Sequence, residues 1–342
     1  MVPLLPWRML MGWRRLRMHD WYPPLNYLRK VMCSESKANS AAHHGLKPER
    51  LELLRKRIHK IKSSWLGRLL FYGIRFRRQV VLDNLKRVFG DALSDQEQRH
   101  LAILFYGHLM RTFFENIAHS WMNEDQIRAR VRLEGVEHLL GAVDQGKGIL
   151  LLTGHFGNWE IAPMGGIAHF PQFKGRLHIL RRQIVNKVIE KILFRRFYAI
   201  GLDIIPKRSS LGRVMDSLSK NDTVAFIMDQ YARPGREGIL VPFFGQEAGT
   251  FKSLAMVARS SESPVLPTVS WREPTGQHVM RFLKPLRWIE HEDADQEVYL
   301  NTQQYNHILE GFVLDHPEQW LWLHKRWKIK QPQKRRRPVE KS

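Results

Sequence analysis

A histidine and a glutamate five residues apart are the residues best suited to chemistry in this chain. His155 and Glu160 lie in the segment GHFGNWE (residues 154–160), which directly follows the apolar run GILLLT. On one continuous helix their side chains would point about 140° apart. They can meet if His155 lies on a turn and Glu160 in the first turn of the next helix. A carboxylate beside an imidazole fixes its tautomer and raises its basicity, so the pair predicts a general base.

The residues between them suit such a turn. Gly154 and Gly157 permit a tight bend in the backbone, and Asn158 is a good N-cap for a helix. The same segment also fits a purely structural role. In that case His155 is a hydrogen-bonded loop residue, and Glu160 only complements the dipole of the helix that follows. Both interpretations stay open at the level of these residues.

Other kinds of site find little support in the sequence. No glycine-rich phosphate loop follows a predicted strand, and neither a Gly-x-Ser-x-Gly elbow nor a His-Glu-x-x-His pair is present. The single cysteine, Cys33, excludes a disulfide scaffold and a cysteine-rich zinc site. We therefore expect no metal, no nucleotide and no other cofactor.

Strand-like and helix-like segments alternate along the middle of the chain. Ser94 and Glu97 form a capping box, and the helix after them has apolar residues at every fourth position, which we expect to be buried: Leu101, Phe105, Leu109, Phe113 and Ile117. Predicted helices also cover 186–199 and 210–219. Predicted strands are 148–153, 177–180, 203–206, 223–228, 264–270 and 278–283. The alternation predicts an α/β fold with a mixed, mainly parallel central sheet flanked by helices.

Polar residues follow four of these predicted strands. His155 follows the first, Arg181 and Arg182 the second, Lys207 and Arg208 the third, and Asp229 with Gln230 the fourth. Open α/β sheets bind ligands outside the carboxyl ends of their strands. Since strand ends are often polar, this observation is weak alone, but it places the predicted site at that edge.

The net charge of +22 is concentrated at the two ends of the chain. Residues 1–78 carry 18 Lys/Arg against 4 Asp/Glu, and residues 325–337 carry 8 against none, whereas 79–324 has 28 of each. We therefore predict three parts: a basic, partly helical arm with a polar linker (1–78), a catalytic domain (79–330) and a basic tail (331–342). One helix is expected from Pro48 to Phe76. Basic ends attract polyanions such as lipid headgroups, nucleic acid or an acidic protein.

No run of 18 apolar residues is present, so the sequence predicts no ordinary spanning helix. Residues 1–28 and 65–76 instead mix aromatic and aliphatic residues with arginines, a composition that suits a lipid headgroup interface. For residues 1–28 a disordered basic tail is the alternative. We expect peripheral or weak membrane attachment.

Five sequence elements together resemble the bacterial lipid A biosynthesis acyltransferases, the late acyltransferases of lipopolysaccharide assembly. The resemblance covers roughly 75–330, in the same order and spacing. It rests on Asn84-Leu85 with Phe89; the His155…Glu160 segment; Arg182 with Asn186 and the 195–197 region; Asp229-Gln230 with VPFFG at 241–245 and Thr250; and the closing segment 317–328. Members usually begin with a spanning helix, which the basic arm replaces here.

The resemblance implies transfer of a fatty acyl chain from acyl carrier protein to a hydroxyl of a lipid A precursor or similar glycolipid. The reaction would take place at the cytoplasmic face of the bacterial inner membrane. His155 and Glu160 would be catalytic. Arg182, Asp229, Gln230 and either Arg195 or Arg196 would bind substrate or the oxyanion. The implied partners are acyl carrier protein, a glycolipid acceptor and an anionic membrane surface, with no nucleic acid.

Three alternatives remain at this stage. The basic run 334–337 and the isoelectric point near 10.3 fit a non-enzymatic module that binds nucleic acid or an anionic membrane. A second alternative is a scaffold that has lost catalysis, against which both His155 and Glu160 are present. A third is an acyltransferase for another glycolipid or a phospholipid.

Overall fold

The computed structural model describes residues 48–181, 195, 197–206 and 210–328. All of them belong to one compact unit, His43–Ser342. The predictions for residues 1–47, for most of the helix 186–199, for Lys207 and Arg208, and for the tail 331–342 lie outside the described residues.

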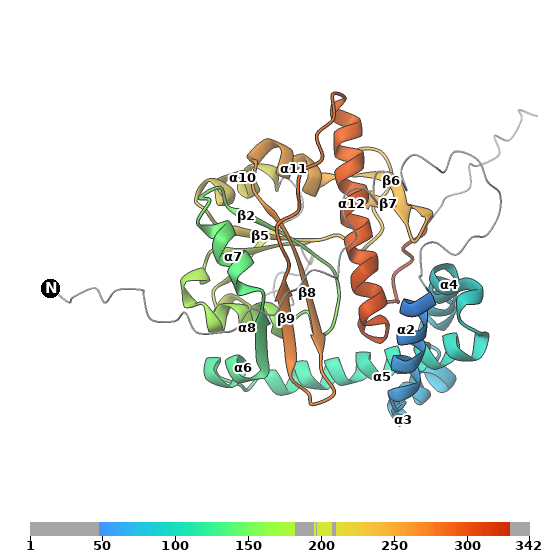
Figure 1. The fold of residues 1–342 in the computed structure, drawn as a ribbon. Coiled ribbons are helices and arrows are strands. Elements are labelled where there is room, and N and C mark those ends of the chain that lie inside the picture. Colours follow the sequence, from blue (N-terminus) through green and yellow to red (C-terminus); the bar gives the residue numbers. More distant parts are fainter. Residues whose placement is uncertain (1–47, 182–194, 196, 207–209, 329–342) are drawn as a thin grey trace, which may run out of the picture. The chain divides into compact units, whose positions relative to one another are not determined.

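A mixed seven-stranded sheet organises this unit (Figure 1). Its strand order is β1-β9-β8-β2-β5-β3-β4. All neighbours are parallel except β8 and β9, which form an antiparallel hairpin. The predicted mixed, mainly parallel sheet is thus confirmed. The strands are β1 (Val131–Glu134), β2 (Ile149–Thr153), β3 (Leu177–Arg181), β4 (Leu202–Pro206), β5 (Thr223–Ile227), β8 (Val265–Arg272) and β9 (His278–Phe282).

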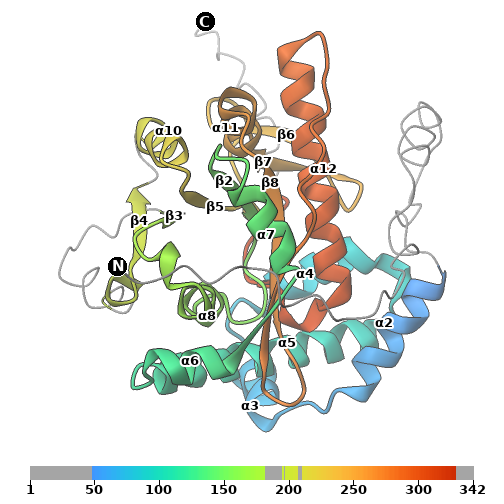
Figure 2. The ribbon, with the colours of Figure 1, turned by 60° about the vertical axis from the view of Figure 1, so that its left-hand side comes forward.

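The apolar strands are buried on both faces of the sheet, which explains their unbroken hydrophobic runs. In β2, Leu150 and Leu152 enter one hydrophobic core, whereas Ile149 and Leu151 enter the other. The second core is closed by α6 (Glu124–Arg130), α7 (Val136–Val143) and α8 (Ile161–His169). The first core is closed by α4 (Arg78–Phe89), α5 (Asp95–His119), α10 (Leu211–Ser219), α11 (Ser253–Ser261) and α12 (Ala294–Asp315). Figure 2 shows the sheet between these two sets of helices.

Six of the predicted strands are present, and three strands were missed. β1 is only four residues long and carries two charged side chains, so its sequence has no strand signature. β6 (Gly238–Phe243) and β7 (Gln246–Phe251) form a separate antiparallel hairpin that contains Pro242 and several glycines. Proline and glycine are unfavourable in most strands. Here Asn306 of α12 donates a hydrogen bond to the Pro242 carbonyl at 2.8 Å, which helps to fix the hairpin on the main body.

The single helix predicted from Pro48 to Phe76 is wrong beyond Lys60. α2 (Pro48–Lys60) ends there, and α3 (Trp65–Arg68) begins after Ser64, whose hydroxyl accepts a hydrogen bond from the Gly67 amide at 3.0 Å. The π-helical turn η1 (Leu69–Ile74) follows directly. The capping serine explains the break, because it satisfies an amide that a continuous helix would bond internally.

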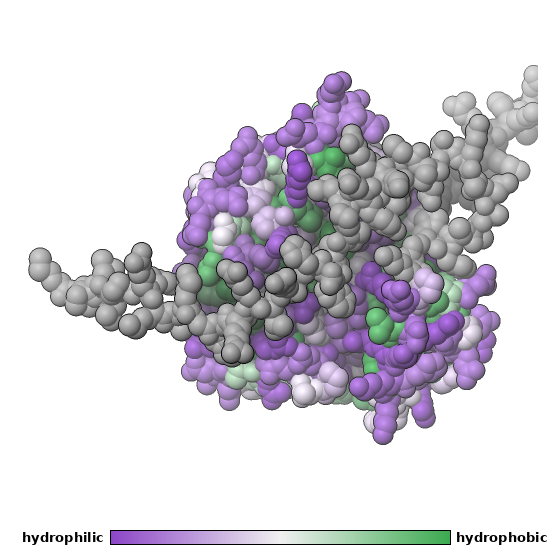
Figure 3. Space-filling view, viewed as in Figure 1, coloured by the Kyte–Doolittle hydropathy of each residue, from purple (hydrophilic) through white to green (hydrophobic). Residues whose placement is uncertain are grey.

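The predicted capping box at Ser94 and Glu97 is confirmed, but the predicted apolar row on α5 is only half buried. Leu101 and Phe105 lie in the core, whereas Phe113 and Ile117 are exposed. The first half of the helix is covered by other elements, while this face of the second half is not. The face of the molecule seen in Figure 3 is mostly hydrophilic, with apolar residues visible only in small patches.

Within the described part of the chain, no helix has the length and apolar character that crossing a bilayer requires.

Short 3-10 turns complete the described structure: η2 (Gly90–Ala92), η3 (Pro171–Phe173) and η4 (Pro317–Gln319).

Candidate active site

His155 and Asp229 meet at the carboxyl edge of the sheet. β2 and β5 are parallel neighbours, so the residues that follow them emerge side by side. The two side chains are joined by a hydrogen bond of 3.0 Å between His155 Nδ1 and Asp229 Oδ1. The backbone amide of His155 also donates to Asp229 Oδ2 at 2.8 Å. The carboxylate therefore holds both the ring and the backbone of the histidine.

Asp229 is buried and accepts a further hydrogen bond from the indole Nε1 of Trp320 at 2.9 Å. Burial raises the pKa of Asp229, but the charge and hydrogen bonds of His155 outweigh it and the pKa falls to about 2. Burial likewise lowers the pKa of His155, and the Asp229 carboxylate more than reverses this, so the pKa is raised. An ionised carboxylate only accepts hydrogen bonds, so Nδ1 carries a proton and Nε2 is left as the basic nitrogen.

The loop that carries His155 is held by three hydrogen bonds from its backbone to two other parts of the chain. The Phe156 carbonyl accepts from Ser270 Oγ at 2.9 Å, and the Gly157 amide donates to the Gln319 carbonyl at 3.0 Å. The His155 carbonyl accepts from the Leu321 amide at 3.1 Å. These bonds tie the loop to β8 and to the closing segment of the chain, so its conformation does not depend on the loop alone.

Two glycines permit this close packing. Gly157 has a φ of +57°, and a Cβ there would lie 2.7 Å from the Ser270 carbonyl oxygen. At Gly154 a Cβ would lie 2.9 Å from the carboxylate carbon of Asp229. Both glycines predicted for the turn are therefore needed, one for its backbone angle and both for space.

A buried polar network supports the loop from α5. Arg272 Nη2 donates to His108 Nδ1 at 3.0 Å, so the proton of neutral His108 lies on Nε2, which donates to the Gly157 carbonyl at 3.1 Å. Burial, with the Arg272 cation adding to it, lowers the pKa of His108 to about 3. Glu115 Oε2 accepts from Arg272 Nη1 at 3.3 Å and from Asn158 Nδ2 at 3.4 Å. His108 is thus a neutral structural histidine.

A second histidine lies beside the first. The ring centroids of His155 and His324 are 5.9 Å apart, and the amide nitrogen of Gln230 lies 3.1 Å from His324 Nε2 and 3.4 Å from His155 Nε2. Burial lowers the pKa of His324, and the nearby His155 and Arg77 add to this, with Asp229 opposing. His324 is therefore neutral near pH 7, and it lies within reach of a group bound at His155.

The predicted site residues have different places in the structure. Asp229 and Gln230 lie in the site, and Asp229 supplies the carboxylate bonded to His155. Glu160 occupies the N-cap position of α8, where its amide donates to Asn158 Oδ1 at 3.2 Å. The expectation of Asn158 as the N-cap and Glu160 in the first turn is therefore wrong by two residues, although Asn158 Oδ1 accepts from the Glu160 amide and, at 3.3 Å, from the Ile161 amide. Arg195 is exposed on a helical segment. Arg182 and Arg196 lie outside the described residues.

Sequence reasoning gave no site role to three residues that border the site, Trp320, His324 and Arg77, and it interpreted His108 as an ordinary structural histidine. His324 and Trp320 belong to the closing segment 317–328, which is one of the five elements that carry the family resemblance. That membership was the signal that could have pointed to them. His108 and Arg77 had none, because their roles depend on which elements pack around the loop.

A histidine held by a buried carboxylate at the edge of a mainly parallel α/β sheet has the geometry that general-base catalysis requires. Sequence comparison identifies the class more closely. The chain belongs to the bacterial lipid A biosynthesis acyltransferase family, whose model matches residues 53–329. The predicted resemblance and the prediction of an acyltransferase are thereby confirmed, and a purely non-enzymatic basic module is not supported.

Curated relatives of two kinds are similar to most of the chain. The lipid A biosynthesis lauroyltransferase of Escherichia coli is 26% identical over 78% of this chain and 83% of its own length. The palmitoleoyltransferase of the same organism is 24% identical, covering 74% and 79%. The phosphatidylinositol mannoside acyltransferase of Mycolicibacterium smegmatis is 22% identical, covering 71% and 77%.

Proposed function

We propose that this protein transfers a fatty acyl chain from the thioester of acyl carrier protein to a hydroxyl of a lipid A precursor or similar glycolipid. The observation that carries the proposal is the bond of 3.0 Å between His155 Nδ1 and Asp229 Oδ1. It leaves Nε2 as a base of raised pKa beside Gln230 and His324.

In this mechanism, His155 Nε2 takes the proton of the acceptor hydroxyl as its oxygen attacks the thioester carbonyl. The tetrahedral intermediate carries its negative charge on the former carbonyl oxygen. When the carbon–sulfur bond breaks, the imidazolium of His155 returns the proton to the leaving thiolate. Asp229 stabilises the imidazolium between these two steps, so no covalent acyl-enzyme is required.

Other residues are assigned to charge stabilisation. Neutral His324 accepts from the Gln230 amide on Nε2, so its proton lies on Nδ1, and we assign to that N–H a hydrogen bond to the developing oxyanion. Arg182 and either Arg195 or Arg196 hold phosphate or the oxyanion. Glu160 is kept as a proposed contributor of negative charge to the site, although the carboxylate bonded to His155 is that of Asp229.

Charge and the family resemblance support the proposed acyl donor and the proposed location. Acyl carrier protein and phosphorylated glycolipids are polyanions, which basic segments at 1–78 and 325–337 attract. We place the protein at the cytoplasmic face of the bacterial inner membrane, peripherally or weakly attached.

A second acceptor class has one specific observation in its favour. A relative named phosphatidylinositol mannoside acyltransferase matches 71% of the chain. A transfer assay with purified protein, labelled acyl carrier protein thioester and both kinds of glycolipid distinguishes the acceptors. Transfer to lipid A precursors supports the proposal, transfer only to mannosylated inositol lipids supports the second candidate, and transfer to neither contradicts both.

A further inference from the structure

Large apolar side chains are exposed on two stretches that lie close to the active site. Fifteen such residues are exposed in the described part of the chain, and nine of them fall in 65–76 and 113–121. We call these nine the apolar face. Five of them lie on α3, on η1 or two residues after η1: Trp65, Leu69, Tyr72, Ile74 and Phe76. The other four lie on α5 or two residues after it: Phe113, Phe114, Ile117 and Trp121. Trp65 and Trp121 are 71% and 77% exposed.

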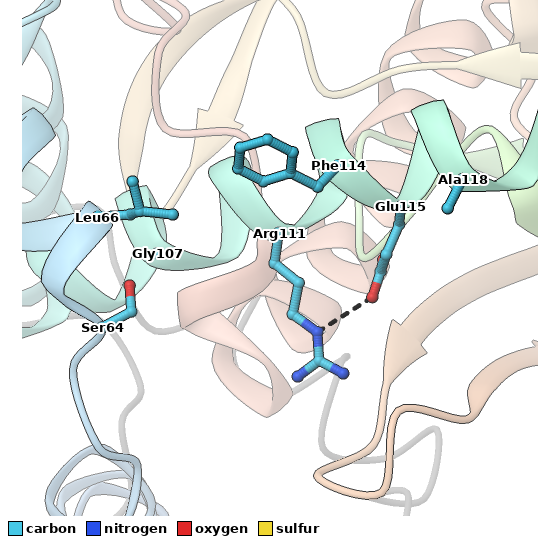
Figure 4. Close-up of a pocket in the computed structure, with 7 residues that line it drawn as sticks. All are labelled: Ser64, Leu66, Gly107, Arg111, Phe114, Glu115 and Ala118. Atoms are coloured by element: carbon cyan, nitrogen blue, oxygen red, sulfur yellow. Dashed lines mark hydrogen bonds and ion pairs between the residues drawn. The ribbon is translucent and has the colours of Figure 1, made fainter.

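The two stretches border each other because α3 crosses α5 at glycines. A Cβ on Gly67 would lie 2.5 Å from the Ile103 carbonyl oxygen, and one on Gly107 would lie 2.7 Å from Ser64 Oγ. Between the two helices lies a surface pocket of about 440 Å³, lined by Leu66, Phe114 and Ala118 among others (Figure 4). Figures 1 and 2 both show α3 against α5 at the same end of the unit.

α5 separates the apolar face from the catalytic loop. At 100° per residue, its exposed apolar residues lie roughly 120–180° around the helix from His108. His108 bonds the Gly157 carbonyl at 3.1 Å, two residues from His155. The other stretch leads directly into α4, where Asn84 Nδ2 donates to the His324 carbonyl at 2.7 Å. The loop that carries His155 thus lies on the side of α5 opposite to the exposed residues of the apolar face.

The charges around the apolar face favour an anionic partner. Residues 53–82 contain no Asp or Glu. Arg68 donates to Ser63 Oγ, and Arg75 to the Tyr72 carbonyl, so neither is bonded to a carboxylate. Arg77 has no ion pair among the described residues. Their charges are therefore left for an external anion.

We propose that the apolar face enters the headgroup and upper acyl region of an anionic lipid bilayer, with these arginines on lipid phosphates. Tryptophan, tyrosine and arginine around aliphatic residues are the composition of a membrane interface. This inference rests on the proposed function, because a membrane-bound apolar face would hold His155 at the depth where a membrane glycolipid presents its hydroxyls. Its physical test does not depend on turnover.

The full chain provides matched probe positions. On a Cys33→Ser background, a single cysteine is placed at Leu69 or Ile117 and labelled with the environment-sensitive dye NBD. Controls are Met256→Cys and Leu240→Cys, since Leu69 and Met256 are both 47% exposed and Ile117 and Leu240 both 41%. The controls lie on α11 and β6, at the other end of the unit in Figures 1 and 2.

Vesicles of phosphatidylcholine with phosphatidylglycerol should shift NBD emission to the blue at 69 and 117 but not at 240 or 256. Pure phosphatidylcholine should give a weaker effect. Equal shifts at all four positions, or none at 69 and 117, would overturn the proposal. Emission at 69 and 117 that is already blue without vesicles would also overturn it, by showing that protein covers the face. If that blue-shifted emission depended on protein concentration, a second copy of the protein would be the partner that covers the face. If it did not, another segment of this chain would be.

A variant then tests binding itself. Combined Leu69→Gln and Ile117→Gln should weaken vesicle binding roughly tenfold or more per side chain, whereas Leu240→Gln with Met256→Gln should not. Turnover on a detergent-solubilised acceptor should be equal in both variants and the parent. If the parent and both variants show no turnover but only the Leu69→Gln/Ile117→Gln variant binds vesicles more weakly, the proposed function is contradicted while the proposed membrane-binding face is supported.

Discussion

Asp229 determines the proton chemistry of His155. It fixes the imidazole through Nδ1, and its charge raises the pKa of the ring against the effect of burial. A histidine with a raised pKa remains protonated to a higher pH. Since the mechanism needs neutral His155, activity should rise with pH through a limb that lies above the ordinary histidine value of about 6.5.

Replacing Asp229 by asparagine removes the charge that raises the pKa of His155. Burial then acts alone, so the acid limb of kcat/KM should move to lower pH. The maximal rate should also fall, roughly 100-fold or more, because the imidazolium is no longer stabilised. The pH dependence of kcat/KM, measured with the same substrates for both proteins, checks both effects.

Glu160→Gln is the matched control for this measurement. Because the bonded carboxylate is that of Asp229, Glu160→Gln should move the acid limb less than Asp229→Asn does. A limb that moves with Glu160→Gln and stays in place with Asp229→Asn would contradict the assignment of the partner.

The sequence singled out His155 but not the carboxylate that is bonded to it. His155 stands in a recognisable segment, whereas Asp229 is 74 positions away and meets it only because β2 and β5 are adjacent. Asp229 was expected at the correct edge, as one of several strand-end residues. Strand order is set by long-range packing, so spacing along the chain favoured Glu160.

At the scale of elements, the loop that carries His155 depends on close contact with β8. Gly157→Ala should place a methyl group against the Ser270 carbonyl and strain a backbone with φ of +57°. We expect a loss of stability of about 1–3 kcal/mol together with a fall in kcat, measured by urea unfolding and turnover on one preparation.

Gly146→Ala controls for backbone strain. Gly146 has a φ of +69°, but nothing lies within 4 Å of a Cβ there. It should cost about 1 kcal/mol and leave turnover unchanged. Equal effects of the two substitutions on stability and rate would show that contact between the loop and β8 is unimportant.

The closing segment is fixed by a buried arginine. Arg326 donates to the Gly249 carbonyl at 2.6 Å and to Thr250 Oγ1 at 2.7 Å, and burial lowers its pKa to about 10. Arg326→Leu should destabilise the protein by about 3–5 kcal/mol, because it removes three buried hydrogen bonds from a charged donor, one of them to Asn306 Oδ1 at 3.2 Å. Chemical unfolding measures this loss.

Lys220→Met is the surface comparison. The Lys220 side chain is 63% exposed, and its partner Asp216 lies one helical turn before it. This substitution should change stability by less than about 0.5 kcal/mol. An Arg326 variant that is no less stable than the Lys220 variant would rule out the anchoring role.

Sequence patterns predicted helices and strands well where a single feature, such as an apolar run or a capping residue, marks the element. The doubly buried strands β2 and β5 appear as unbroken apolar runs, and Ser94 marks the start of α5. Periodicity failed at Phe113 and Ile117, whose spacing matches that of Leu101 and Phe105 although their face is exposed. Spacing shows that residues share a face, and tertiary packing decides whether that face is covered.

For the whole molecule, charge should govern recognition of the donor. The net charge of +22 is opposite to that of acyl carrier protein. Because such attraction is screened by salt, the KM for acyl carrier protein thioester should rise with ionic strength. The KM for an acyl thioester of pantetheine, which lacks the protein, is the control and should change little. Equal salt dependence for both donors would exclude electrostatic docking of the carrier.

The most direct test of the account is His155→Ala in the transfer assay. With acyl carrier protein thioester and a lipid A precursor, the variant should lose roughly 10²–10⁴-fold in kcat, because general-base catalysis is worth about that factor. Its thermal unfolding should still show a folded protein that binds the carrier. A well-folded His155→Ala protein with near-normal turnover would contradict the central claim.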